Sequence, residues 1–212
     1  IPLVFVGDYI ESLNVPSVVM DSDDAVHKLL NHLHQLGHIK IGFLSVAYKS
    51  AVLAEREAAF KSGLERLGLE YKSNYVRHAE ISAEISVYEN VRKLVLQNDP
   101  PSAIICVSDY VALQAMAELA RLGVKVPNDV AVAGIGNVTY SDHPFFSLTT
   151  VDECRVELGR RAASLLLSEL EMDEKSRSGN SPNIQNIRIK GQLLTRASTL
   201  GGKTFIPGNS SI

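Results

Sequence analysis

The sequence has few of the features that mark secreted, zinc-binding or membrane proteins. It contains two cysteines among 212 residues, Cys106 and Cys154, and neither belongs to a C-x-x-C pair. This argues against a disulfide framework or a zinc site and favours a reducing compartment, so we expect a cytoplasmic protein. No apolar run approaches the roughly 20 residues that a membrane-spanning helix needs.

Excess positive charge and catalytic motifs are also missing. The net charge is −3 at pH 7 and no cluster of Lys and Arg occurs, which argues against a segment that binds a phosphate backbone on its own. Walker loops, G-x-S-x-G elbows and H-E-x-x-H helices are absent from the sequence. We therefore expect neither an enzyme nor a protein that holds a metal or cofactor.

What the sequence does contain is a regular alternation of apolar β-type runs and helical stripes. Such alternation predicts parallel βαβ units with right-handed crossovers, an α/β fold. Strands are expected at 3–6, 17–20, 39–45, 75–76, 103–107, 130–135, 148–151 and 187–194, and helices at 21–36, 54–67, 87–95, 110–122 and 155–170. The polar stretch 172–183 is expected to be a mobile loop and the region from 199 a tail.

Two of these units end in small and polar residues at the carboxyl end of the strand. The run 103–107 stops at Ser108-Asp109, and the run 130–135 stops at Gly136-Asn137. Because ligands of open α/β sheets bind at the carboxyl ends of strands, this edge is predicted to hold a small-molecule site.

Several segments, taken in order, resemble the effector-binding core of lactose-repressor/galactose-repressor family regulators, over about residues 1 to 198. They are Gly37-His38-Ile39-Lys40-Ile41-Gly42-Phe43, Glu55-Arg56-Glu57-Ala58-Ala59-Phe60, Ser108-Asp109-Tyr110-Val111-Ala112, Val124-Lys125-Val126-Pro127-Asn128-Asp129-Val130 and Leu148-Thr149-Thr150-Val151. The resemblance implies two doubly wound parallel-sheet subdomains of periplasmic-binding-protein type I with a ligand between them. It also implies that the amino-terminal subdomain is truncated and that the DNA-binding headpiece is absent.

On this resemblance the chain divides into recognisable parts. Residues 1–20 and 152–173 would belong to the incomplete amino-terminal subdomain, and 21–151 with 184–198 to the carboxyl-terminal effector-binding subdomain, leaving 199–212 as a tail. An incomplete subdomain exposes strand edges whose unpaired backbone groups can bond to another chain, so we expect a homodimer.

The resemblance also suggests the ligand-binding residues Arg56, Asp109 and Asn137. Arg56 matches the family arginine that reaches the effector, and a first-turn surface arginine should leave stability nearly unchanged when replaced. Asp109 either caps the helix that follows it or contacts the ligand.

Two glycines depart from the family pattern. Gly136 stands where the family usually has an acidic residue, and Gly7 where some sugar-responsive members have an aspartate. A site that lacks these carboxylates but keeps Arg56 is better suited to an anionic effector than to a neutral sugar. The alternative is a degenerate site that binds no ligand.

The leading functional hypothesis is the effector-sensing and dimerising core of a transcriptional regulator, and the family resemblance implies that this regulator is a repressor. Its effector would be a sugar, a sugar phosphate, an organic acid or another small metabolite, and DNA would be bound only through a headpiece outside this chain. A solute-binding protein of a sugar transport system is the alternative with the same fold. An α/β enzyme is disfavoured because no catalytic constellation is visible.

Overall fold

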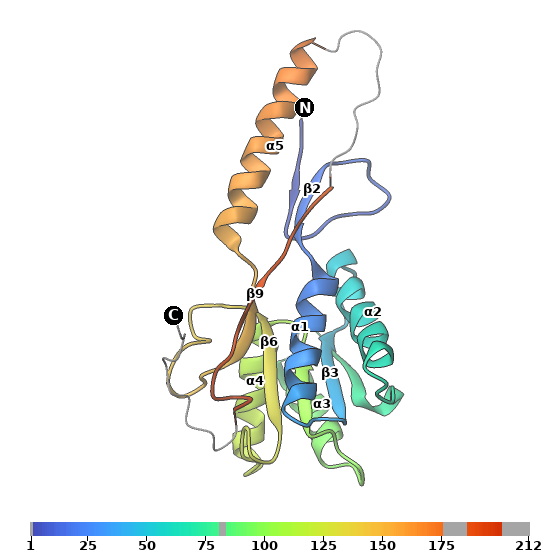
Figure 1. Ribbon diagram of the computed structural model, residues 1–212, viewed down its shortest axis with the longest axis vertical. Coiled ribbons are helices and arrows are strands. Elements are labelled where there is room, and N and C mark those ends of the chain that lie inside the picture. Colours follow the sequence, from blue (N-terminus) through green and yellow to red (C-terminus); the bar gives the residue numbers. More distant parts are fainter. Residues whose placement is uncertain (1, 81–83, 176–185, 201–212) are drawn as a thin grey trace, which may run out of the picture.

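The computed structural model describes residues 2–80, 84–175 and 186–200 of the chain. The molecule is elongated, with a large lower part and a small upper part from which one long helix rises (Figure 1). Among the described helices, none is long and apolar enough to cross a membrane.

The lower part is a six-stranded sheet with helices on both faces. Its strand order is β4-β3-β5-β6-β7-β9, parallel except for β9, which runs antiparallel to β7. From β3 the chain moves first to β4 and then back across the sheet to β5 and β6. Right-handed crossovers therefore place α2 on one face and α3 and α4 on the other. Consistent with this, α1 packs against α2, and α3 packs against α4.

The elements of this large subdomain are bounded as follows: α1 Ser22–Gln35, β3 Ile41–Val46, α2 Ala51–Arg66, η1 Ser73–Tyr75, β4 Val76–Ala79, α3 Glu84–Val95, β5 Ala103–Cys106, α4 Asp109–Arg121, β6 Ala131–Gly136, β7 Thr149–Asp152 and β9 Gln192–Leu194. The central strands β5 and β6 are buried along their whole length, because helices cover the sheet on both sides. The stacked rings of Phe43 and Phe60, with centroids 4.9 Å apart, join β3 to α2 in the core.

The upper part is a small parallel sheet with one helix packed on it. Its order is β1-β2-β8, formed by Phe5–Val6, Ser17–Met20 and Asn186–Ile189. Helix α5, Arg155–Lys175, buries Leu158, Ala162 and Leu165 against Val18 of β2. The helix continues past the predicted end at 170 to Lys175, into the predicted loop 172–183; residues 176–185 lie outside the described ranges.

The last predicted strand, 187–194, is wrong as a single element. The structure divides it into β8, in the small sheet, and β9, in the large sheet, with Lys190-Gly191 between them. The assignment of the whole of 184–198 to the large subdomain is therefore corrected at Asn186–Ile189. Thr199, predicted to start a tail, is buried and bonded to Thr149 in the core; residues 201–212 lie outside the described ranges.

The described chain crosses between the two sheets at three places that lie side by side. The crossings follow β2, β7 and β8, and the backbone N–H of Asp21 donates to the carbonyl of Ile189 at 2.8 Å. A Cβ at Gly191 would lie 2.4 Å from Cγ1 of Val151, 2.7 Å from the carbonyl oxygen of Asp152 and 3.3 Å from the sulfur of Met20. The contact brings all three crossings together, and only glycine fits there.

Replacing Gly191 with alanine is expected to lower the free energy of unfolding by about 1–3 kcal/mol, because the new methyl group meets backbone that cannot move aside easily. Urea denaturation followed by circular dichroism measures the change. Gly159→Ala in α5 is the matched control: a Cβ there has no described atom within 4 Å, and alanine favours a helix. Equal stability of the two variants would contradict the tight packing of the crossings.

Candidate functional site

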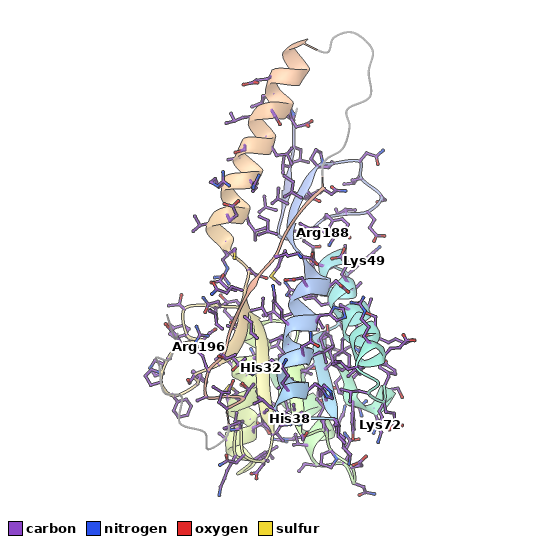
Figure 2. The ribbon with its side chains drawn as sticks, in the orientation of Figure 1. His32, His38, Lys49, Lys72, Arg188 and Arg196 are labelled. Carbon is purple, nitrogen blue, oxygen red and sulfur yellow. The ribbon has the colours of Figure 1, made fainter. Side chains whose placement is uncertain are left out.

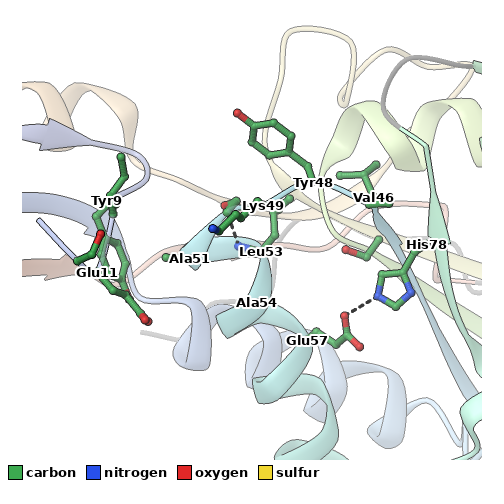
Figure 3. Close-up of a pocket in the computed structure, with 15 residues that line it drawn as sticks. Tyr9, Glu11, Val46, Tyr48, Lys49, Ala51, Leu53, Ala54, Glu57 and His78 are labelled. Carbon is green, nitrogen blue, oxygen red and sulfur yellow. Dashed lines mark hydrogen bonds and ion pairs between the residues drawn. The ribbon is translucent and has the colours of Figure 1, made fainter.

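A cavity of about 760 Å³ lies where the small subdomain faces the first turns of α2. One wall is Tyr9–Ser12, in the loop after β1, and the opposite wall is Ser45–Ala51, the end of β3 and the loop that follows it. Leu53, Ala54 and Glu57 of α2 and His78 of β4 complete the lining. Figure 3 shows Tyr9 and Glu11 on one side of the cavity, and Tyr48, Lys49 and His78 on the other.

The lining combines aromatic surfaces with hydrogen-bonding groups of both charge signs. Tyr48 is 59% exposed, and Nε2 of His78 lies 2.7 Å from the carboxylate of Glu57. Lys49 and Glu11 add one cation and one further anion. A pocket of this size with apolar walls and a few polar groups is suited to a small polar molecule. Within the described ranges, no three His, Cys, Asp or Glu side chains are grouped as metal ligands.

The amino-terminal end of α2 at this cavity is capped from both subdomains. The Ser50 hydroxyl accepts a hydrogen bond from the N–H of Leu53 at 3.1 Å. The carboxylate of Asp8, in the small subdomain, accepts from the N–H of Val52 at 3.3 Å. A carboxylate is favourable here because the amino-terminal end of a helix carries partial positive charge.

Arg56 lies in the second turn of α2 and is not among the residues that line the cavity. The helix begins at Ala51, a turn earlier than predicted, because Ser50 is its cap. Only 5% of Arg56 is exposed, and its guanidinium donates to the carbonyl of Val107 at 2.7 Å and to Glu153 at 2.9 Å. The prediction of a surface arginine is therefore wrong, and its carboxylate partner is Glu153, which the sequence analysis did not consider.

Asp109 is fully buried, and its carboxylate joins three parts of the chain. It accepts hydrogen bonds from the hydroxyl of Ser141 at 2.5 Å, from that of Thr150 at 2.6 Å and from the N–H of Val138 at 3.1 Å. The cap of α4 is Ser108, whose hydroxyl accepts from the N–H of Val111. The interpretation of Asp109 as the cap is thus wrong: it occupies the first helical position and ties α4 to the segments after β6 and in β7.

Asn137 stands at the end of β6 with a positive φ of 49°. Its amide nitrogen donates to the carboxylate of Asp152 at 2.8 Å, and its amide oxygen accepts from Arg196 at 2.9 Å. At neighbouring Gly136, the carbonyl accepts from the guanidinium of Arg155 at 2.9 Å. Both ends of the Asn137 amide are therefore engaged within the protein.

The structure brings Arg56, Asp109 and Asn137 to the same edge of the large sheet but not into the cavity. Each contacts a residue at or just after the carboxyl end of β5, β6 or β7, namely Val107, Val138 or Asp152, whereas the described lining contains none of the three. The lining residues Tyr48 and His78 were missed. The signal for Tyr48 was present, because the same carboxyl-end argument applied to β3 leads to Tyr48-Lys49-Ser50.

A second group of residues that the sequence analysis did not predict, Tyr9, Glu55 and Arg188, connects the two subdomains beside the cavity. The Tyr9 hydroxyl donates to Glu55 of α2 at 2.5 Å; this bond and burial raise the pKa of Tyr9. Burial alone raises the pKa of the Glu55 carboxyl, but hydrogen bonds from Arg188 and Tyr9 outweigh it and hold that pKa below its ordinary value. Glu55 is therefore ionised at neutral pH.

Comparison with known proteins identifies the fold. A family model described as the periplasmic binding protein-like domain matches residues 30–199. The chain belongs to this family. The predicted resemblance and the predicted fold class, parallel-sheet subdomains of the periplasmic-binding-protein type, are thereby confirmed.

Two curated relatives and one solved structure illustrate the similarity of this periplasmic binding protein-like chain. The repressor CytR of Escherichia coli K12 is 28% identical over 170 residues, covering 80% of this chain and 50% of CytR. The repressor PurR of Mannheimia succiniciproducens is 30% identical over 167 residues, covering 79% and 48%. A LacI family transcriptional regulator from Mycobacterium smegmatis superposes with a TM-score of 0.81 at 25% identity, covering 94% and 70%. The chain spans about half the length of these curated relatives.

Proposed function

We propose that this chain is the effector-sensing core of a DNA-binding transcriptional repressor, and that the effector binds in the cavity between Tyr9–Ser12 and the start of α2. The observation that carries the proposal is the position of the cavity, which has one wall on each subdomain. A ligand that contacts both walls binds their closed arrangement better than an open one, and this differential affinity is what allosteric regulation requires.

The relatives favour a regulator over a transport protein, since both curated relatives described above are repressors. They also favour a regulator over an enzyme. DNA would be contacted by a headpiece outside this chain, because the chain has a net charge of −3 and duplex binding relies on positive charge. Because both relatives are transcriptional repressors of bacteria, where the chromosome lies in the cytoplasm, a cytoplasmic location is part of the proposal.

Assembly as a homodimer is part of the proposal. Leu3, near the edge strand β1, and Val6, within it, are 54% and 51% exposed, and Val156 at the start of α5 is 88% exposed. Exposed apolar side chains on a small subdomain that also has a strand edge are suited to burial against another protein surface.

The proposed effector is a neutral, polar ring compound such as a sugar. The case for an anion depended on Arg56 having no carboxylate partner, and Glu153 provides one. The cavity itself pairs His78 with Glu57 and balances Lys49 with Glu11, so its lining has no excess of cations that would attract an anion. Tyrosine rings and hydroxyl groups suit the apolar faces and hydroxyls of a sugar ring.

Tyr48→Ala is expected to weaken binding of the effector about 5- to 10-fold, because one aromatic wall of the cavity is lost. A thermal-shift screen of neutral sugars, nucleosides, sugar phosphates and organic acids identifies the ligand, and calorimetry measures its affinity for each variant. Tyr71→Ala is the control, since Tyr71 is also exposed but lies beyond the other end of α2. A ligand that binds both variants equally well would place the effector elsewhere.

A further inference from the structure

The two subdomains are joined by a set of polar contacts besides the three chain crossings. Arg188 of β8, in the small sheet, forms two hydrogen bonds to Glu55 of α2, in the large subdomain, with N–O distances of 2.8 and 2.5 Å. Figure 2 shows Arg188 at the junction between the upper and lower parts of the molecule. A guanidinium that contacts both oxygens of a carboxylate is a strong and strongly directional pair.

Tyr9 completes this group from the small subdomain. Its hydroxyl donates to the same Glu55 oxygen that Arg188 contacts at 2.5 Å, and the Arg188 guanidinium lies over the Tyr9 ring, 5.9 Å from its centre. Glu55 therefore receives hydrogen bonds from two residues across the subdomain boundary. Tyr9 is at the same time part of the cavity wall, so the orientation of that wall depends on Glu55.

A cluster of ion pairs within α5 differs from the Glu55–Arg188 pair in what it connects. Glu157 contacts Arg160 and Arg161, and all three belong to α5, so this cluster is unaffected by movement of the subdomains. The Glu55–Arg188 pair, with side chains 25% and 42% exposed, must break when α2 and the small sheet move apart.

We infer that Tyr9, Glu55 and Arg188 form a clamp that holds the two subdomains together over the cavity. Glu55 is the central residue, because each of the other two contacts it. Tyr9 is a positioning residue, which connects the clamp to the cavity wall. The clamp follows from the contacts alone; its role in sensing an effector rests on the proposed function.

The separation of the subdomains, measured without any ligand, tests the clamp. Spin labels are attached through Glu65→Cys on α2 and Glu171→Cys on α5 in a Cys154→Ser background, and the distances between them are measured by pulsed electron paramagnetic resonance. Both label sites are exposed. In Glu55→Gln and in Arg188→Gln, we expect a population at longer distance that is about tenfold larger than in the parent chain, since a charged hydrogen-bonded pair has been lost.

Two further variants separate the clamp from a general loss of structure. The exchange Glu55→Arg with Arg188→Glu restores the opposite charges and is expected to restore the short distance. Glu157→Gln removes an equally paired carboxylate within α5 and is expected to leave the distances unchanged. Unchanged distances in both single variants would overturn the clamp, as would an exchange variant that is folded by circular dichroism yet stays open. Because no ligand is added, these outcomes are independent of whether the cavity binds an effector.

Discussion

Replacing Asp109 with alanine is expected to lower the free energy of unfolding by about 3–5 kcal/mol. The substitution removes the acceptor of hydrogen bonds from Ser141, Thr150 and Val138, and leaves these donors in a site that is closed to water. Each unsatisfied buried donor costs about 1–3 kcal/mol. Urea denaturation at neutral pH, followed by circular dichroism, measures the loss.

Two variants define the origin of this effect. Asp109→Asn keeps the shape of the side chain but places amide hydrogens against hydroxyl and N–H donors, so we expect a smaller loss of about 2 kcal/mol. Asp142→Ala, at an exposed position in the loop after β6, should change stability by less than about 0.5 kcal/mol. If Asp109→Ala were as stable as Asp142→Ala, the buried carboxylate would not be what joins α4 to β7.

Arg56→Met is expected to lower the free energy of unfolding by about 2–4 kcal/mol, although the apolar stem of the side chain is kept. Its loss leaves the carbonyl of Val107 and the carboxylate of Glu153 without the guanidinium that contacts both. Glu153 keeps part of its exposure to water, which limits the cost. The measurement is again urea denaturation, with ligand affinity determined separately by calorimetry.

A double-mutant cycle distinguishes the ion pair from a general packing defect. Arg56→Met combined with Glu153→Gln should be more stable than the sum of the single effects predicts, by about 1–2 kcal/mol. Arg66→Met is the matched control at the exposed end of the same helix, and it should cost little. Additive effects of the two substitutions would show that the Arg56–Glu153 contact contributes nothing of its own.

Much of the fold could be predicted because it follows from the spacing of apolar residues within single strands and helices. The apolar runs that became β5 and β6 are buried on both faces, so every side chain in them is apolar or small. In α1, the apolar residues at helical spacing likewise form one buried face: Val26, Leu29, Leu30 and Leu33. Patterns of this kind depend only on the spacing of residues along one element.

The carboxyl-end argument placed the candidate residues at one edge of the sheet, where the structure also has them, but it did not predict which groups they contact there. Ser108-Asp109 and Gly136-Asn137 do follow buried strands, as the carboxyl-end argument requires. Whether a polar side chain there faces a cavity or a neighbouring strand depends on residues far away in the sequence. Asp109 contacts Thr150, which lies 41 residues further along the chain.

The alternation of strands and helices, the family, and the edge of the sheet with the polar residues could all be predicted from the order of residues along the chain. The folded molecule was needed to show that 187–194 divides between two sheets, that Glu153 binds Arg56 and that Arg188 contacts Glu55. The physical reason is the range of the interactions. Periodicity reports which side of an element is apolar, whereas the partner of a charge and the sheet that a strand joins are set by how separate elements pack in space.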